Sequence, residues 1–276
     1  YNDENGSLVG TYYTDENGKI EIKDLRIGNY KLKEISTNKW YNLAENQDLQ
    51  INWDETTKTI VEDELKKGQI RIIKIDKEDK KIRIPNVTFE VQDVNGNILE
   101  KITTDENGEA LTSKYPLRDY QSLRLREIET DEKYELESEI KEITLEENEV
   151  KDVQIENEKI KGYIEIRKTS GENNKITGVQ KGESLEGVKF EIYDLNGDLV
   201  QKLTTNSDGI AMSKELEKGK YNVKEVETND WYLIDKNTYE VEIENNKQII
   251  NLNLENLPVN PDEEIVKKAG EMKIPV

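Results

Sequence analysis

The sequence predicts an all-β protein in which short, half-buried strands pack as sandwiches. Apolar and β-branched residues alternate with polar ones, as in Ile70-Arg71-Ile72 and Val87-Thr88-Phe89. Turn clusters such as Asp-Glu-Asn-Gly separate these runs, and the whole pattern recurs along the chain. A side-chain period of two between turn signals is typical of strands that bury one face.

An internal repeat sets the order of the expected elements. Each copy has a first turn ending in Asn-Gly, a second turn of five residues, and then a strand that ends in glutamate. The first turn is Asn5-Gly6, Asn95-Gly96 and Asn196-Gly197, the second is Thr14–Gly18, Thr104–Gly108 and Thr205–Gly209, and the glutamates are Glu34, Glu127 and Glu225. A unit of roughly a hundred residues suits a small sandwich of about seven strands.

The repeat divides the chain into three units and a tail. We expect an incomplete first repeat over 1–67, a second over 68–161, a third over 162–258, and a tail or the start of another unit over 259–276. The first repeat has no counterpart of Ile70–Val91. Almost no linker separates the repeats, which favours a stiff, extended array.

Composition removes several classes of function. The chain has 276 residues, a net charge of −20, and neither His nor Cys. The absence of His and Cys excludes Ser–His and Cys–His nucleophile pairs, imidazole or thiolate zinc sites, and disulfides. The acidic balance argues against nucleic acid and an anionic membrane as partners.

The Asp-Glu-Asn-Gly clusters fit turn chemistry better than a calcium loop, so we expect no metal and no cofactor. Composition alone leaves a glycosidase pair of carboxylates open.

Three polar residues in each complete repeat fall on the face that the alternation assigns to the core. Residues at i, i+2 and i+4 of a strand share one face. On that basis a lysine follows two isoleucines, a glutamate follows two apolar residues, and an asparagine ends the last strand. The three residues are Lys74, Glu127 and Asn157 in the second repeat, and Lys168, Glu225 and Asn256 in the third.

Two structural explanations and one chemical explanation compete for these positions. Each residue could leave the core at a strand end, although the recurrence of all three argues against this. Lysine and glutamate could form a buried ion pair, which costs several kcal/mol per ion. Alternatively, desolvation favours a neutral amine and a neutral acid. The amine can then attack the asparagine carboxamide while the acid carries protons to the departing ammonia, which leaves an uncharged Lys–Asn amide.

The order Ile-x-Ile-x-Lys, Asn-Gly, Thr-Asp-Glu-Asn-Gly, Tyr-x-Val-x-Glu and Leu-x-Leu-x-Asn resembles the collagen-adhesin B-type, or SpaA-like, domains of Gram-positive surface proteins. The resemblance covers roughly residues 1–258 and implies tandem immunoglobulin-like (prealbumin-like) β-sandwich modules. It also implies self-formed isopeptide bonds, assisted by glutamate. These would be Lys74–Asn157 with Glu127, and Lys168–Asn256 with Glu225.

The chain departs from the family pattern in two places. The Pro-x-Gly-Tyr step that often follows the glutamate strand is replaced, for example by Asn229-Asp230-Trp231-Tyr232. In the first repeat, Asp63 stands at the asparagine position, so Glu34 and Asp63 form an incomplete site. Aspartate can serve in such a bond, with water leaving in place of ammonia.

The resemblance implies a structural stalk or spacer of a cell-surface adhesin or pilus-like fibre, not an enzyme with turnover. It implies an extracellular location, on the surface or wall of a Gram-positive bacterium, with neighbouring modules of the same or an adjacent chain as partners. Two alternatives stay open. One is a module that binds a host protein or glycan through Trp40 and Trp231, although their recurrence favours packing. The other is a fibre assembled by strand donation from the tail, with Lys267 or Lys268 facing Asp63.

Overall fold

The computed structural model describes residues 1–2 and 6–259. Every regular element in that part of the chain is a β-strand, so the all-β prediction is confirmed. Over the same residues there is no helix with the length and apolarity needed to cross a bilayer. The tail segment from 260 onward, with Lys267 and Lys268, lies outside the described residues.

The chain divides into two compact units. The first comprises Tyr1–Lys74, Ile84–Glu129 and Ser138–Ile155, and the second comprises Ile75–Arg83, Thr130–Glu137 and the chain from Glu156 onward. The division runs through the second repeat. The third repeat therefore lies wholly inside one unit, and it gives the most complete view of the fold and of the candidate site.

The third repeat is built from two four-stranded sheets. One has the order β13-β12-β16-β17, and the other has β14, β15 and β18 paired with β11. The strands are β11 (Lys161–Ser170), β12 (Lys189–Tyr193), β13 (Leu199–Thr204), β14 (Ile210–Met212), β15 (Leu216–Glu217), β16 (Gly219–Glu227), β17 (Thr238–Ile243) and β18 (Gln248–Asn256). Two sheets of alternating strands bury a shared core, as the sandwich prediction requires.

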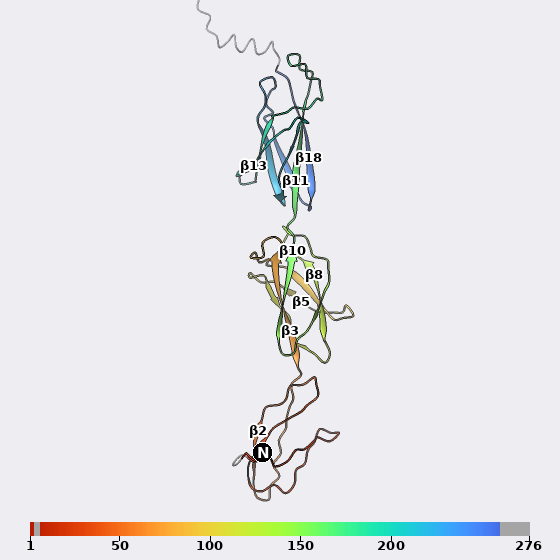
Figure 1. Ribbon diagram of the computed structural model, residues 1–276, viewed down its shortest axis with the longest axis vertical. Helices are drawn as coiled ribbons and strands as arrows, with labels where there is room; N and C mark the ends of the chain where they lie inside the picture. Colours follow the sequence, from red (N-terminus) through yellow and green to blue (C-terminus); the bar gives the residue numbers. More distant parts are fainter. Residues whose placement is uncertain (3–5, 260–276) are drawn as a thin grey trace, which may run out of the picture. The chain divides into compact units, whose positions relative to one another are not determined.

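The first and last strands of the third repeat are parallel neighbours. β11 and β18 run side by side (Figure 1), with Ile164 opposite Ile250 and Lys168 opposite Leu254. Every other strand pair in this repeat is antiparallel. The parallel pairing brings the strand that carries Lys168 beside the strand that ends in Asn256, although almost the whole repeat separates the two residues in sequence.

The core of the third repeat follows the alternation along each strand. Ile164 and Ile166 of β11, Phe190 and Ile192 of β12, and Val223 of β16 have no exposed surface. Lys168, Glu225 and Asn256 continue the same faces and are buried as well. The strand-end explanation, in which these polar residues leave the core, is therefore wrong for the third repeat.

The second repeat has the same order of strands. Its sheets are β5-β4-β8-β9 and a second one in which β10, β6 and β7 pair with β3. The strands are β3 (Lys67–Asp76), β4 (Thr88–Gln92), β5 (Ile98–Thr103), β6 (Glu109–Leu111), β7 (Tyr115–Pro116), β8 (Ser122–Glu129), β9 (Lys141–Thr144) and β10 (Val150–Asn157). Counting the two-residue strands β7 and β15, each complete repeat has one strand more than the seven expected.

The first repeat is much less regular. It has one two-stranded sheet, in which β1 (Gly28–Leu32) pairs with β2 (Gln47–Ile51), and the rest is drawn largely as coil (Figure 1). Among its described residues, Tyr30 is the one buried apolar side chain. Its counterpart in the third repeat, Tyr221, is buried to a similar degree, and both hydroxyls donate to a backbone carbonyl four residues earlier.

The Asn-Gly clusters form turns, as their sequence predicts. In the second turn of each repeat one carboxylate or amide oxygen accepts two backbone N–H groups, and a glycine with positive φ closes the turn. The accepting residues are Asp15, Asp105 and Asn206. The backbone N–H of Glu109 holds the pKa of Asp105 below its usual value. These oxygens are used by the turn itself, which is why the clusters carry carboxylates.

Candidate functional site

Lys168 is a fully buried lysine whose place in the fold is set by a turn. Its side chain lies on the same face of β11 as Ile164 and Ile166 and has 0% exposure. Its backbone N–H donates to the carbonyl of Gly209 at 2.7 Å. Gly209 has φ +71°, and an added Cβ there would lie 2.4 Å from the Lys168 carbonyl oxygen. The turn that ends in Gly209 therefore packs directly on the backbone of the lysine.

Glu225 of β16 contacts both other members of the group. Its Oε2 lies 2.8 Å from Lys168 Nζ, and its own side chain is 1% exposed. Its Oε1 accepts a hydrogen bond from Asn256 Nδ2 at 2.7 Å. One carboxylate thus contacts both the amine on β11 and the carboxamide at the end of β18, and all three side chains are buried.

The carboxamide of Asn256 is held by its nitrogen. Nδ2 also donates to Thr228 Oγ1 at 3.1 Å. Asn256 Oδ1 is buried and has no hydrogen-bond partner among the described residues. Lys168 Nζ donates to the carbonyl of Glu255, the residue before Asn256, at 3.2 Å. A buried carbonyl oxygen without a donor costs about 1–3 kcal/mol, so it lowers the stability of the unreacted arrangement.

The surroundings of the amine are apolar on one side and polar on the other. Lys168 Nζ lies 5.8 Å from the centre of the Phe190 ring. Two residues further along β11, Ser170 Oγ is 3.0 Å from the hydroxyl of the buried Tyr232. The Phe190 ring is thus the apolar neighbour of the amine.

The second repeat shows part of this set of contacts for the residues that the sequence singles out. Lys74 Nζ lies 2.7 Å from Glu127 Oε2, with side-chain exposures of 0% and 1%. Lys74 N–H donates to the carbonyl of Gly108, the counterpart of Gly209. Asn157 is buried, and its Nδ2 donates to Thr130 Oγ1 at 2.9 Å. Lys74 Nζ also lies 5.8 Å from the centre of a phenylalanine ring, that of Phe89.

One position next to the lysine differs between the two repeats. Where the third repeat has Ser170, the second has the buried Asp76, which accepts a hydrogen bond from the Tyr134 hydroxyl at 2.9 Å. Burial opposes the charge of Asp76, but the backbone N–H of Asp79 and the Tyr134 hydroxyl outweigh it and hold the pKa of Asp76 below its usual value. Burial, together with Asp76, raises the pKa of Tyr134.

In the first repeat, Glu34 and Asp63 occupy the corresponding places without a lysine. Glu34 Oε2 accepts the backbone N–H of Ala44 at 2.7 Å, and Asp63 Oδ2 accepts the hydroxyl of Thr37. Both acidic residues are only half-buried. Among the described residues, no lysine forms an ion pair with either carboxylate.

A threonine is the functional residue that sequence reasoning missed. Each of three threonines contacts the Asp or Asn of its own repeat: Thr37 contacts Asp63, Thr130 contacts Asn157, and Thr228 contacts Asn256. Each stands three residues after the glutamate, so the signal Glu-x-x-Thr was present in all three repeats. Alternation alone does not reveal its role, because the threonine lies beyond the regular strand, where the direction of a side chain no longer follows the period of two.

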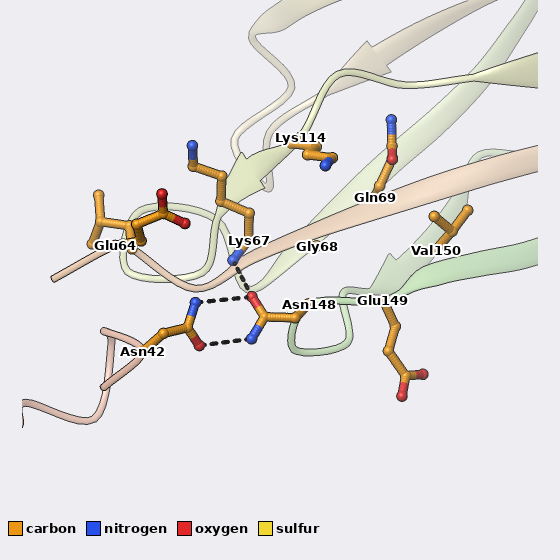
Figure 2. A pocket seen from close by; sticks show the side chains of 10 residues that line it. Asn42, Glu64, Lys67, Gly68, Gln69, Lys114, Asn148, Glu149 and Val150 are labelled. Atoms are coloured by element: carbon orange, nitrogen blue, oxygen red, sulfur yellow. Dashed lines mark hydrogen bonds between the residues drawn. The ribbon is translucent and has the colours of Figure 1, made fainter. Parts of the chain in front are cut away.

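The structure also contains a cavity of about 270 Å³ that lies away from these groups. Figure 2 shows its wall, where the amides of Asn42 and Asn148 face each other and exchange hydrogen bonds of 3.4 and 2.7 Å. Its lining side chains include no hydroxyl, thiol or imidazole group. They therefore supply no nucleophile–base pair of the usual kinds. Within 1–2 and 6–259, no cluster of three or more acidic side chains is placed to hold a metal ion.

The aromatic residues of the loop after the glutamate strand only partly pack as expected. Tyr232 and Tyr134 are buried, and each forms a backbone bridge to the end of its repeat. Trp231 is 43% exposed, so the expectation of packing is wrong for its side chain. Its carbonyl still accepts the N–H of Val259 at 3.0 Å, which explains why this loop recurs at one place in the repeat.

A model of the SpaA prealbumin-like fold domain matches residues 1–65, 68–159 and 162–258. The chain belongs to this SpaA family. The tandem arrangement of SpaA domains and the prealbumin-like sandwich are therefore shown by the family match together with the strand order. The match to 1–65 includes the first repeat, despite its small content of regular strand.

This SpaA chain is similar to three known proteins from Gram-positive bacteria. The trypsin-resistant surface T6 protein of Streptococcus pyogenes serotype M6 is 36% identical over 67 residues, which cover 24% of this chain and 12% of that protein. The Bacillus anthracis TIE protein is 30% identical, with a TM-score of 0.72 over 88% of this chain and 44% of that one. The chain thus spans less than half the length of either relative. GBS52, the minor pilin of Streptococcus agalactiae, is 19% identical over 76% of this chain and 99% of that one, with a TM-score of 0.33, which by itself supports no conclusion about this chain.

Proposed function

We propose that the chain is a structural stalk or spacer of a cell-surface adhesin or pilus-like fibre. Its complete modules, 68–161 and 162–258, are locked by the isopeptide bonds Lys74–Asn157 and Lys168–Asn256. Glu127 and Glu225 assist the two reactions. The module over 1–67 is incomplete. The observation that carries this proposal is the burial of Lys168, Glu225 and Asn256 together, with one carboxylate contacting both the amine and the carboxamide.

The reaction needs no group from outside the chain. The neutral amine of Lys168 attacks Cγ of Asn256, so an N–C bond forms and the bond from Cγ to Nδ2 breaks. One proton leaves Nζ and one proton joins Nδ2, which departs as ammonia. Glu225 lies against both nitrogen atoms and carries the proton between them. Each module reacts once, so the chain is not an enzyme with turnover.

The bond would remove the main energetic weakness of the buried group. Burial of the Lys168–Glu225 ion pair costs several kcal/mol per ion in desolvation free energy. The amide formed by Lys168 and Asn256 carries no charge and avoids this cost for the lysine. The bond also closes a loop of 256 − 168 = 88 residues in the third module. By analogy with disulfides, closing such a loop stabilises the folded state by roughly 4–5 kcal/mol. A module of this kind resists force without depending on the redox state of its surroundings.

The relatives support an extracellular place for the modules. The T6 protein of Streptococcus pyogenes is named as a surface protein. We infer a location on the surface or cell wall of a Gram-positive bacterium, with neighbouring modules of the same or an adjacent chain as partners.

Intact-mass spectrometry of the denatured chain tests the proposal. The expected mass is lower than that of the sequence by two ammonia molecules, one for each complete module. Lys74→Ala and Lys168→Ala should each restore one ammonia, and the double variant should restore both. Lys189→Ala, which removes an exposed lysine, is the matched control and should keep the full deficit. A wild-type mass equal to that of the linear sequence would contradict the cross-links.

A second candidate function, contact with a host protein or glycan, has one observation in its favour. Trp231, Leu233 and Ile234 are exposed together in one loop of the third repeat. Aromatic side chains beside loops can stack on sugars or anchor a protein interface. Trp231→Ala should then reduce adhesion to host surfaces while leaving hydrogen exchange in the third repeat unchanged. Unchanged adhesion would leave the stalk as the only supported role.

A further inference from the structure

Two lysines in the segment that joins the second and third repeats each contact carboxylates of both repeats. Lys159 Nζ lies 2.9 Å from Glu217 Oε1 and 3.9 Å from Asp76 Oδ2. Asp76 ends β3 of the second repeat, and Glu217 belongs to β15 of the third. All of these residues lie in the second compact unit, which contains one end of the second repeat together with the third repeat.

Lys161 forms the same kind of bridge two residues later. Its Nζ donates to both carboxylate oxygens of Glu78 in the second repeat, at 2.7 and 2.5 Å, and lies 3.7 Å from Glu215 Oε2 in the third. The two lysine side chains are largely buried, with exposures of 22% for Lys159 and 18% for Lys161. The hydrogen bond from Glu217 raises the pKa of Lys159, and that from Glu78 raises the pKa of Lys161, so both lysines are charged at neutral pH.

The residue between the two lysines is bound to both repeats through its backbone. The N–H of Ile160 donates to the carbonyl of Lys133 in the second repeat at 2.8 Å. The carbonyl of Ile160 accepts the N–H of Lys218 in the third repeat at 2.9 Å. The ion pairs therefore flank a segment whose backbone is held on both sides, and these two amides report directly on whether it stays held.

This use of lysine is particular to the junction of the second and third repeats. Backbone bridges with a tyrosine of the same repeat assign Leu65, Lys159 and Pro258 to one position. The side chains of leucine and proline form no ion pair. The acidic partner changes in step, because the third repeat has Ser170 where the second has Asp76. The buried acid and the lysine that contacts it thus occur in the same repeat.

The lysines also separate like charges. The carboxylates of Asp76 and Glu217 come from different repeats, and both lie within 4.0 Å of the same nitrogen atom, Nζ of Lys159. Removal of the lysine charge would leave these carboxylates close together, and like charges repel. Asp76 is only 1% exposed, so water screens its charge poorly.

We propose that Lys159 and Lys161 form an ionic clasp that holds the end of the second repeat against the start of the third, and that the joint loosens as the ionic strength rises. The distance over which salt leaves charges unscreened falls from about 10 Å at 0.1 M to about 3 Å at 1 M. The clasp goes beyond the proposed spacer function, and it forms without any covalent reaction. It makes the stiffness of one joint in the chain depend on the surrounding salt.

Spin labels test the clasp in the full chain, which has no cysteine of its own. Glu132→Cys and Ser207→Cys place one label on an exposed position of each repeat. Pulsed electron–electron double resonance should give a narrow distribution of label distances at about 0.1 M salt and a broader one at about 1 M. The double variant Lys159→Met and Lys161→Met should give the broad distribution at both salt concentrations.

Hydrogen exchange of single amides, measured by NMR, gives a second readout. In the double variant the amides of Ile160 and Lys218 should exchange faster, on the order of tenfold, because they hold the joint. The amide of Ile166, in the core of the third repeat, should keep its wild-type rate. Lys220→Met removes an exposed lysine that pairs with Glu240 inside the third repeat, and this matched control should change neither measurement.

An exchange of charges separates the ion pair from the packing of the lysine stem. Lys161→Glu should broaden the distance distribution, because it adds a negative charge beside Glu78. Adding Glu78→Lys to the same chain should narrow the distribution again, since the pair is restored with its charges reversed. A distribution that stays broad in this double exchange would count against the clasp.

Two other results would overturn the inference. One is a Lys159→Met and Lys161→Met variant whose distance distribution and Ile160 exchange equal those of wild type. The other is faster exchange at Ile166 alongside the broadening, because the third repeat would then be unfolding. The ammonia deficit of the same samples reports the proposed cross-links separately, so either proposal can fail while the other stands.

Discussion

The first and third repeats share one order of turns, glutamate strand and closing residue, yet only the third has a core. Tyr30 and Tyr221 are buried to a similar degree, so this one position of the glutamate strand is alike in both. Val61 and Leu254 differ in exposure because only Leu254 has β11 beside it. The comparison teaches that the strand that brings the lysine also builds the core. The chemistry and the fold therefore depend on the same element.

Removal of Lys168 should have the largest effect, because this residue supplies the cross-link that the first repeat does not have. In Lys168→Ala, the cross-link is lost and Glu225 stays buried without its partner. We expect a loss of roughly 4–5 kcal/mol from loop closure and a further contribution from the cavity left by the deleted side chain. Hydrogen exchange followed by mass spectrometry should show the third repeat approaching the rapid exchange of the first.

The second repeat serves as an internal reference for this experiment. Its exchange should be unchanged in Lys168→Ala, because its own lysine and glutamate are intact. Lys189→Ala in the third repeat removes only an exposed ion pair and should cost less than about 1 kcal/mol. Protection of the third repeat that survives Lys168→Ala would show that its core does not depend on the cross-link.

A pair of glycine substitutions compares the second turn of the first repeat with that of the third. Gly18 and Gly209 have the same φ of +71°, but an added Cβ meets nothing within 4 Å at Gly18 and lies 2.4 Å from the Lys168 carbonyl oxygen at Gly209. Gly18→Ala should cost about 1–2 kcal/mol from backbone strain alone. Gly209→Ala should cost roughly 2–5 kcal/mol, because the clash adds to the strain.

The measurement for the two glycines is exchange of the backbone amides in each repeat, together with the rate at which ammonia is lost from newly folded chain. Gly209→Ala should slow that loss, since the turn fixes the lysine backbone. Equal costs at the two glycines would mean that the turn does not position Lys168.

A smaller effect is expected at the threonine that follows the glutamate. Thr228→Val keeps the shape of the side chain and removes the hydroxyl that accepts from Asn256 Nδ2. The expected cost is about 1 kcal/mol for an unreacted third repeat. Thr37→Val should cost less, because Asp63 is only half-buried and water can replace the hydroxyl. Loss of ammonia followed over time would show whether Thr228 positions the carboxamide, and an unaltered rate would exclude that role.

The smallest effect concerns pH and distinguishes the second repeat from the third. The pKa of Asp76 in the folded state lies below its usual value, so its contribution to stability is present above about pH 4 and is lost as the pH falls through the lower folded-state pKa. Ser170 takes its place in the third repeat and does not titrate. Below pH 4 the second repeat should therefore lose exchange protection first, and Asp76→Ser should reduce that difference.

The sequence predicts the burial of the polar residues because the period of two is strict along the strands. Lys168 follows Ile164 and Ile166 on one face, and no turn or bulge interrupts the pattern between them. Asp63 could be assigned to the asparagine position for a related reason, since its distance to the glycine that opens the next repeat equals that of Asn157.

Other parts of the site could not be predicted in this way. The contact of Thr228 with Asn256 depends on how the chain turns after β16, and residue types alone do not specify that path. The close approach of Gly209 to Lys168 depends on packing between elements distant in sequence. In the first repeat the pattern of 57–63 is that of a strand, but a strand needs a neighbour, so local propensity could not decide its state.

The parallel pairing of β11 with β18 decides how the third repeat meets tension. A pull applied at Lys161 and at Asn256 acts on opposite ends of the strand pair, so its hydrogen bonds are loaded together in shear and do not open one after another. If the pair parted, the 88 residues between Lys168 and Asn256 could extend by about 300 Å. An amide between those two residues would confine the extension to the few residues that lead into Lys168.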